Sequence, residues 1–129
     1  MSLCIEYNMY KKLNGGDILY LSVEKHKNNL VVQFKGELDH HTTENVREKI
    51  DQQFFDQKIK NIILDLRGLT FMDSSGIGLI MGRYRNCIDK SGIVAIVNDN
   101  AYVDKMLRMS GLLKIINVYP TIEAATENL

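Results

Sequence analysis

Two adjacent hydroxyl groups, those of Ser74 and Ser75, stand where an apolar segment gives way to a helical pattern. Residues 61–66 form an apolar run that is typical of a buried strand. Apolar side chains then recur with helical spacing at Ile77, Ile80, Met81, Tyr84 and Ile88. This pattern predicts a strand followed by a helix whose N-cap is Ser74 or Ser75. A serine at such a point could act as a nucleophile, contact a bound phosphate, or carry a covalent modification.

The residues that flank the two serines argue against a nucleophile. The nucleophile elbow of hydrolases has the sequence G-x-S-x-G, with a glycine two residues away on each side of the serine. Here Met72 lies two residues before Ser74, and Asp73 lies two residues before Ser75. The elbow is therefore absent, and no base for an enzymatic reaction is identified.

The glycines that follow the serines do not complete a phosphate-binding loop. Such loops need G-x-x-x-x-G-K followed by Ser or Thr, or the dinucleotide motif G-x-G-x-x-G. Gly76, Gly78 and Gly82 give only G-x-G-x-x-x-G. We interpret these glycines as sites where the helix packs closely on the sheet.

Modification of Ser74 is the remaining chemistry. A phosphate at a helix N-terminus meets unsatisfied N–H groups and the positive end of the helix dipole. A plain N-cap, which contributes about 1 kcal/mol of stability, would explain the same serine. Spacing alone leaves these two interpretations open.

Composition limits the partners that the chain can take. With 129 residues, 45% of them hydrophobic, the chain fits one domain with a single core. Sixteen basic and sixteen acidic side chains give a formal charge of zero, which argues against nucleic acid and anionic membranes. Cys4 and Cys87 lack metal-ligand spacing and are predicted to be free thiols. No signal sequence or membrane-spanning stretch is evident, so we expect a cytoplasmic location.

Strand and helix patterns alternate along most of the chain. Residues 1–17 allow either an extra edge strand or a loose leader, with a turn signal at residues 14–17. Strands are predicted near residues 18–23, 30–38, 59–66, 93–97 and 115–119, the first two as a hairpin. A helix is predicted from Thr42 or Thr43, with Val46, Ile50, Phe54 and Phe55 on its inner face. Further helices are predicted after the serine pair, over residues 100–109 with Gly111 ending the helix, and after Pro120. The alternation predicts an α/β fold with a largely parallel sheet.

In such a sheet, the loops that follow the strands lie together at one edge. These loops carry polar residues, namely Asp39, His40 and His41, then Asp73, Ser74 and Ser75, then Asn98, Asp99 and Asn100. The predicted working face therefore gathers carboxylates, hydroxyls and amides. Adjacent His40 and His41 are expected to point in different directions. No third ligand follows them at metal-binding spacing, so no metal site is predicted.

Four motifs, in a fixed order, make the sequence similar to a known family. They are GELDHHT at residues 36–42, FMDSSGIG at 71–78, GRY at 82–84 and MSGLLKII at 109–116. Together they resemble the anti-sigma factor antagonists, which are STAS domains, and in particular the sporulation type. The resemblance covers residues 18–129 as a single STAS domain and leaves residues 1–17 unmatched.

The resemblance implies a fold, a function and partners. The STAS fold is α/β, a small, mixed, mostly parallel sheet with helices packed mainly on one face. Antagonists of this family bind a cytoplasmic anti-sigma factor that is also a serine kinase, and thereby release the sigma factor that it holds. The kinase phosphorylates the serine after the motif aspartate, here Ser74, and a serine phosphatase reverses this. The resemblance implies no enzyme activity and no cofactor, because the partner kinase uses the ATP.

The resemblance also places a partner-binding surface around the phosphoacceptor. Its residues are Asp39, His40, Asp73, Ser75, Gly76, Ile77, Gly78 and Met81. Asp39 could instead cap the helix that starts near Thr42. Arg83 could meet an acidic patch on the kinase or stay solvated, and the sequence does not choose between these.

Two other functions stand as alternatives. The chain could be a STAS antagonist or scaffold subunit of a different sigma or stress-signalling circuit, although the paired histidines and the GRY run favour the sporulation type. It could also be an enzyme with Ser74 as nucleophile, against which the missing elbow and base stand. We therefore expect a transcription regulator in which phosphate acts as an electrostatic and steric toggle, without refolding.

Overall fold

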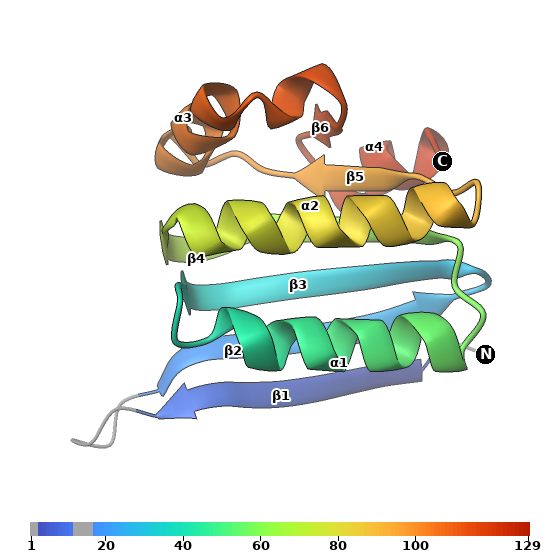
Figure 1. The fold of residues 1–129 in the computed structure, drawn as a ribbon, viewed down its shortest axis with the longest axis horizontal. Helices are drawn as coiled ribbons and strands as arrows, with labels where there is room; N and C mark the ends of the chain where they lie inside the picture. The colour runs from blue at the N-terminus through green and yellow to red at the C-terminus, as the bar shows by residue number, and fades with distance from the viewer. Residues whose placement is uncertain (1–2, 12–16) are drawn as a thin grey trace.

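In the part of the chain that the structure describes, six strands lie in one sheet in the same order as in the sequence (Figure 1). The computed structural model describes residues 3–11 and 17–129. The strands are β1 (Leu3–Lys11), β2 (Asp17–His26), β3 (Asn29–Leu38), β4 (Asn61–Met72), β5 (Val94–Val97) and β6 (Asn117–Tyr119). The helices are α1 (Thr43–Asp56), α2 (Ser74–Asp89), α3 (Ala101–Ser110), the 3-10 helix η1 (Leu112–Lys114) and α4 (Ile122–Glu127).

The sheet is mixed rather than mostly parallel. Strands β1, β2 and β3 pair antiparallel, whereas β3, β4, β5 and β6 pair parallel. The expectation of a mostly parallel sheet is therefore wrong for the N-terminal half. The β2–β3 hairpin was predicted, and its two-residue turn at Lys27 and Asn28 makes these strands run in opposite directions. The difference comes from β1, which adds a second antiparallel pair.

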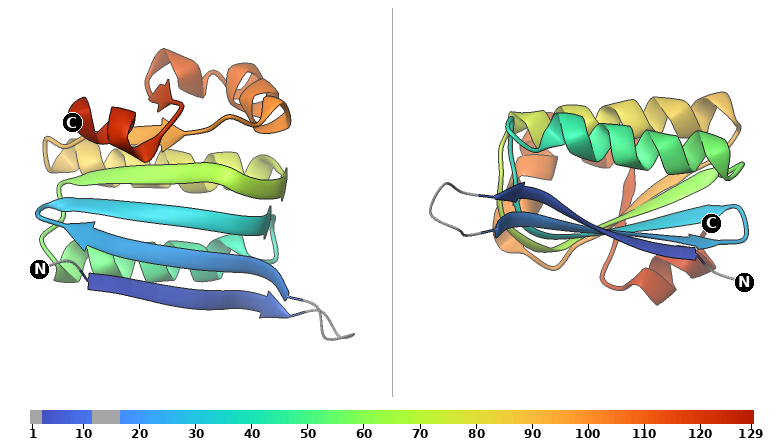
Figure 2. Two further views of the ribbon diagram at one scale, coloured as in Figure 1. Left: turned by 180° about the vertical axis from the view of Figure 1, so that it is seen from behind. Right: turned by 90° about the horizontal axis from the view of Figure 1, so that it is seen from below.

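Before β2, the chain adds an edge strand to the sheet. Strand β1 pairs with β2 from Leu3, opposite Lys25, to Lys11, opposite Asp17. In Figure 2, β1 forms the outer border of the sheet, at the opposite edge from β6. The turn predicted at residues 14–17 falls mainly on residues 14–16, which lie outside the described residues.

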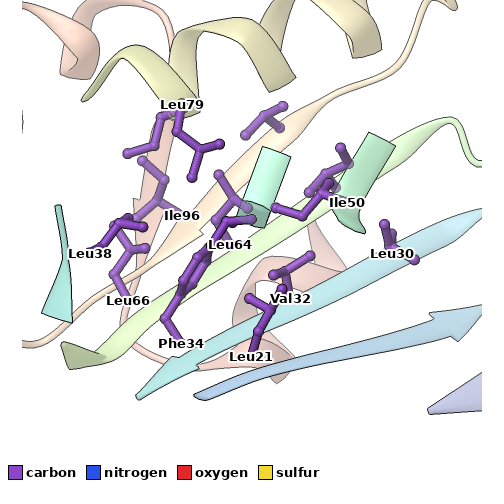
Figure 3. Packing of buried hydrophobic residues seen from close by; sticks show 14 of the residues in the cluster. Leu21, Leu30, Val32, Phe34, Leu38, Ile50, Leu64, Leu66, Leu79 and Ile96 are labelled. Carbon is purple, nitrogen blue, oxygen red and sulfur yellow. The ribbon is translucent and has the colours of Figure 1, made fainter. Parts of the chain in front are cut away.

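The helices pack mainly on one face of the sheet, as expected. Helices α1 and α2 lie side by side on that face, and α4 lies on the opposite face (Figures 1 and 2). The main core lies between the sheet and α1, α2 and α3, where side chains such as Phe34, Leu64 and Leu79 converge (Figure 3). A smaller cluster beneath α4 joins Ala125 to Ile63 and its neighbours.

Local sequence explains most of the element boundaries. In α1, Val46, Ile50 and Phe54 are buried as predicted, because their spacing puts them on one helical face. Phe55, which we also expected to face inward, is exposed. Helix α3 ends at Gly111, whose φ of 82° is the left-handed conformation that favours glycine.

Strand β4 runs beyond its predicted end at Leu66. It continues to Met72 because residues 35–38 of β3 go on pairing with it. Cys4 and Cys87 are both free, as predicted. Within the described part of the chain, no helix combines the length and the apolar character that a membrane crossing requires.

Candidate functional site

Three loops meet at the carboxyl edge of the parallel strands, as the sequence predicted. Two hydrogen bonds join the loops to the neighbouring strands. Asp73 N donates to Leu38 O across 3.3 Å, which links the end of β4 to the end of β3. Asn100 Nδ2 donates to Leu69 O across 3.0 Å, which ties the loop after β5 to β4. The edge is thus a connected polar surface, with Ser74 at its centre between the other two loops.

The N-cap of α2 is Asp73, not either serine. Its backbone is extended, with φ of −108° and ψ of −172°, and its Oδ1 accepts a hydrogen bond from Ser75 N across 2.8 Å. The prediction that Ser74 or Ser75 is the N-cap is therefore wrong. Because β4 continues to Met72, the helix begins directly after Asp73, and both serines already lie in its first turn.

The two serines of this first turn differ in exposure. Ser74 is exposed, whereas Ser75 is half-buried. Since Asp73 supplies the cap, the Ser74 hydroxyl is not needed to satisfy the helix N-terminus. The simple N-cap explanation of Ser74 does not hold, and its hydroxyl faces solvent at the positive end of the helix dipole.

Asp39 organises the loop that follows β3. Its Oδ1 accepts hydrogen bonds from His41 N across 2.8 Å and from Thr42 N across 3.3 Å. Thr42 occupies the N-cap position of α1, but its hydroxyl makes no capping bond and instead accepts one from Asp39 N. The alternative in which Asp39 holds the start of the helix therefore has direct structural support.

His40 connects this loop to the N-cap of α2. Its backbone N donates to Asp73 Oδ2 across 3.2 Å, and its ring Nδ1 lies 3.6 Å from the same oxygen. The rings of His40 and His41 have centroids 3.9 Å apart, so the expectation that they point in different directions is wrong. Among residues 3–11 and 17–129, no three His, Cys, Asp or Glu side chains are grouped as a metal site would require.

The carboxylate of Asp73 is stabilised as an anion. Partial burial acts to raise its pKa, but hydrogen bonds from Ser75 and His40 outweigh this and hold the pKa below its ordinary value. A fixed negative charge therefore lies next to the Ser74 hydroxyl at neutral pH. Any phosphate added at Ser74 would join a charge that is already present.

The glycines of α2 serve different purposes. A Cβ at Gly76 would lie 2.5 Å from Met72 Cγ, so this glycine packs the helix closely on the sheet, as predicted. For Gly78 and Gly82 the same prediction is wrong, because a Cβ at either position would meet no described atom within 4 Å. Alanine at each of these two positions would make the helix more stable by about 1 kcal/mol.

The buried face of α2 differs in part from the apolar residues that the helical spacing predicted. Leu79, Ile80 and Cys87 are buried, whereas Ile77 and Met81 are half-buried and Ile88 is exposed. The predicted stripe left out the buried Leu79 and Cys87 and included the exposed Ile88. The half-buried Ile77 and Met81 pack against the rim of the core and remain partly accessible.

Arg83 is buried, so the interpretation that it stays solvated is wrong, whereas its contact with an acidic group of the kinase stays a prediction. Only 5% of its side chain is exposed, and its Nε lies 3.0 Å from Oδ1 of Asp51 in α1. Asp51 also accepts a hydrogen bond from Asn86 Nδ2 across 3.1 Å. The burial arises because α1 and α2 pack side by side, which the sequence of α2 alone does not reveal.

Sequence reasoning missed an aromatic pair beside the serine. Phe71 and Tyr102 are both exposed, and their rings stack with centroids 6.5 Å apart. Tyr102 OH donates to Met72 O across 3.1 Å, which fixes the end of β4 just before the N-cap of α2. The available signal was an aromatic residue at the end of β4 and another in the first turn of α3, the helix that follows the neighbouring strand β5.

Comparison with known families identifies this arrangement. The sequence model of the STAS domain matches residues 20–125 of the chain. The chain belongs to the STAS domain family. Strand β1 of this STAS domain lies before the matched region, as an addition at the edge of the sheet.

Relatives of this STAS domain are regulators. The chain is 42% identical, over 84% of its length and 94% of the relative's, to an anti-sigma F factor antagonist of Paenibacillus polymyxa. The structure of the anti-sigma factor antagonist SpoIIAA in its unphosphorylated form is similar, with a TM-score of 0.75 and 34% identity over 84% of this chain and 94% of that one.

A second structure shows that related protein in another state. The Bacillus cell fate determinant SpoIIAA in its phosphorylated form matches with a TM-score of 0.68 and 33% identity, over 84% of this chain and 97% of that one. These relatives are binding proteins and not enzymes. This STAS domain is accordingly a regulatory protein of the anti-sigma factor antagonist type and not an enzyme.

Proposed function

We propose that this STAS domain is a cytoplasmic antagonist of an anti-sigma factor that is also a serine kinase. The unphosphorylated form binds that kinase, which then releases its sigma factor, and phosphorylation of Ser74 switches binding off. The observation that carries the proposal is the exposed Ser74 hydroxyl, which Asp73 frees from the capping role by capping α2 itself. The P. polymyxa antagonist of anti-sigma F factor supports the partner class.

The proposed contact surface surrounds Ser74. It comprises the residues that the sequence assigned to partner binding: Asp39, His40, Asp73, Ser75, Gly76, Ile77, Gly78 and Met81. Of these, His40 and Gly78 are exposed and available for direct contact. Gly76 is buried against Met72, so its contribution is to keep α2 close to the sheet. Asp73 and Asp39 shape the two loops that present the surface.

Phosphorylation changes charge more than structure. A phosphate adds about −1.5 to −2 charges at Ser74, next to the ionised carboxylate of Asp73. The helix dipole favours that phosphate by only about 0.3–1 kcal/mol. Its desolvation in a protein interface and its repulsion from acidic partner groups cost more. A tenfold to hundredfold loss of affinity needs about 1.4–2.8 kcal/mol.

The fold is expected to persist after phosphorylation. The chain matches both the unphosphorylated and the phosphorylated form of SpoIIAA, with TM-scores of 0.75 and 0.68. This agrees with a toggle confined to the surface near Ser74. A serine phosphatase would return the protein to its binding form. The domain itself needs no cofactor in this scheme, because the kinase supplies the ATP site.

Intact-mass spectrometry tests the proposal directly. The wild-type protein is incubated with a purified anti-sigma F factor and ATP, beside Ser74→Ala and the matched control Ser75→Ala. We expect one added phosphate in the wild type and in Ser75→Ala, and none in Ser74→Ala. Binding without modification would refute the phosphorylation switch and favour a scaffold domain. Neither binding nor modification would point to a different sigma or stress-signalling circuit.

A further inference from the structure

A groove between α1 and α2 lies beside the proposed switch. The two helices run side by side on one face of the sheet (Figure 1). A cavity of about 280 Å³ opens between them, and its lining includes Ser75, Gly78 and Gly82 of α2 and Arg47 of α1. Because Ser75 follows the phosphoacceptor directly, the groove is continuous with the surface around Ser74.

The two glycines leave the wall of this groove without side chains. Gly78 and Gly82 are four residues apart, so they lie on the same face of α2. A Cβ at either position would meet no described atom within 4 Å, and alanine is the better helix former. Packing within this chain therefore does not require glycine here. Glycine is required where another chain must approach the helix backbone closely.

Arg83 supplies a second, independent observation. Its side chain lines the same groove and is 5% exposed. Asp51 Oδ1 lies 3.0 Å from its Nε, yet neither Nε nor Nη1 makes a hydrogen bond of acceptable geometry to any described residue. A guanidinium offers five donors and prefers a carboxylate that can accept two at once. The lining of the groove therefore contains a buried guanidinium that is paired with Asp51 but has N–H donors left without hydrogen bonds.

We propose that this groove receives an acidic side chain of the anti-sigma factor. Its carboxylate would pair with Arg83, and with Arg47 at the rim, while the segment that carries it packs against Gly78 and Gly82. The inference rests on the proposed function and extends the contact surface onto α1. In the unbound domain, Arg47 Nη2 lies 3.4 Å from the exposed carboxylate of Glu44. Such an exposed ion pair is weak, so a partner carboxylate can take the place of Glu44 beside Arg47.

The groove also gives the switch a physical cause. A phosphate at Ser74 would carry about −1.5 to −2 charges at the end of the groove where Ser75 lies. An acidic side chain that enters the groove would then meet a like charge before it reaches Arg83. The repulsion would act on the bound partner without any movement of α1 or α2.

Alanine substitutions separate partner contact from stability. In Gly78→Ala and Gly82→Ala, we expect the melting temperature to rise by about 3 °C, because alanine stabilises the helix. We expect the affinity for a purified anti-sigma F factor, measured by isothermal titration calorimetry, to fall by about tenfold or more, because a methyl group would occupy the groove. Arg85→Ala, at an exposed position of α2 outside the groove lining, is the matched control and should bind like the wild type.

A charge substitution at the rim tests the proposed carboxylate. Arg47→Glu changes an exposed residue, so the fold should persist, and we expect about a tenfold loss of affinity with a weaker dependence on salt. Wild-type affinity in both alanine variants and in Arg47→Glu would overturn the groove inference while leaving the Ser74 switch intact. If the wild type neither binds the anti-sigma F factor nor becomes phosphorylated, both proposals fall.

Discussion

Asp73 is the residue that joins the capping of α2 to the loop after β3, so its removal should measure how firmly the site is held. Asp73→Ala removes the acceptor for Ser75 N, 2.8 Å from Oδ1, and the acceptor for His40 N, 3.2 Å from Oδ2. The first loss leaves α2 without its N-cap. The second disconnects the loop after β3 from the start of α2.

The two lost interactions set the expected magnitude. Replacing an aspartate N-cap by alanine costs about 1 kcal/mol. The hydrogen bond to His40 N, which is partly exposed, adds about 1 kcal/mol. We therefore expect the free energy of unfolding to fall by about 2 kcal/mol, which lowers the melting temperature of a domain of this size by about 8 °C.

Thermal and urea unfolding, followed by circular dichroism at pH 7, measure this change. Asp73→Asn is the matched control, because asparagine is an N-cap of similar strength, and it should recover at least half of the lost stability. Ser75→Ala keeps the backbone N–H that donates to Asp73 Oδ1 and removes only the Ser75 hydroxyl, which also bonds to Asp73, so it should lose less stability than Asp73→Ala. If Asp73→Ala melts within about 2 °C of the wild type, Asp73 does not hold the start of α2 and this reasoning is wrong.

The same carboxylate predicts a pH dependence. Despite the opposing effect of burial, the hydrogen bonds hold the pKa of Asp73 in the folded state below its unfolded value. The stability that the ionised form contributes is therefore present above the unfolded pKa, near 3.9, and is lost as the pH falls through the lower folded pKa. We expect the advantage of wild type over Asp73→Asn to be constant from about pH 5 to 8 and to shrink below about pH 4. A constant difference down to pH 2 would contradict the pKa argument.

Three further substitutions test the packing of the fold, each by urea unfolding. Gly92→Ala should lower the free energy of unfolding by more than about 3 kcal/mol or prevent folding. Its Cβ would lie 1.7 Å from Lys60 O, a backbone atom that cannot easily move aside. A variant as stable as the wild type would contradict this prediction. Asp51→Ala should lower the free energy of unfolding by about 3 kcal/mol, because it leaves the buried Arg83 without its counter-charge. A loss below about 1 kcal/mol would show that water solvates the ion pair. Gly111→Ala should lower the free energy of unfolding by about 1 kcal/mol, because alanine disfavours the left-handed φ of 82° at this position. An unchanged urea midpoint of unfolding would mean that the backbone at the end of α3 adjusts to the alanine.

Sequence patterns predicted those parts of the fold that depend on local physics. The spacing of Val46, Ile50 and Phe54 placed the inner face of α1, because 3.6 residues per turn brings them to one side. Gly111 marked the end of α3, because few other residues adopt a positive φ there. The gathering of the three loops followed from the alternation of strands and helices.

Predictions failed where a contact distant in sequence decided the outcome. Ser74 or Ser75 was expected to cap α2, but pairing of β4 with β3 carries the strand to Met72 and leaves Asp73 as the cap. Arg83 was expected outside, but the neighbouring helix supplies Asp51 and buries it. Neither result could be read from a local window of sequence, because each depends on an element at least 30 residues away.

The sequence by itself determined the family, the order of most strands and helices, and the position of the serine pair at the start of α2. Each is encoded in residues close together along the chain, through motif spacing, hydrophobic periodicity and residue conformational preference. Only the tertiary structure decided that Asp73 serves both α2 and the loop after β3, and that Gly78, Gly82 and Arg83 line a groove against α1. The reason is that a carboxylate shared between two loops and a groove between two helices exist only once segments distant in sequence have packed together.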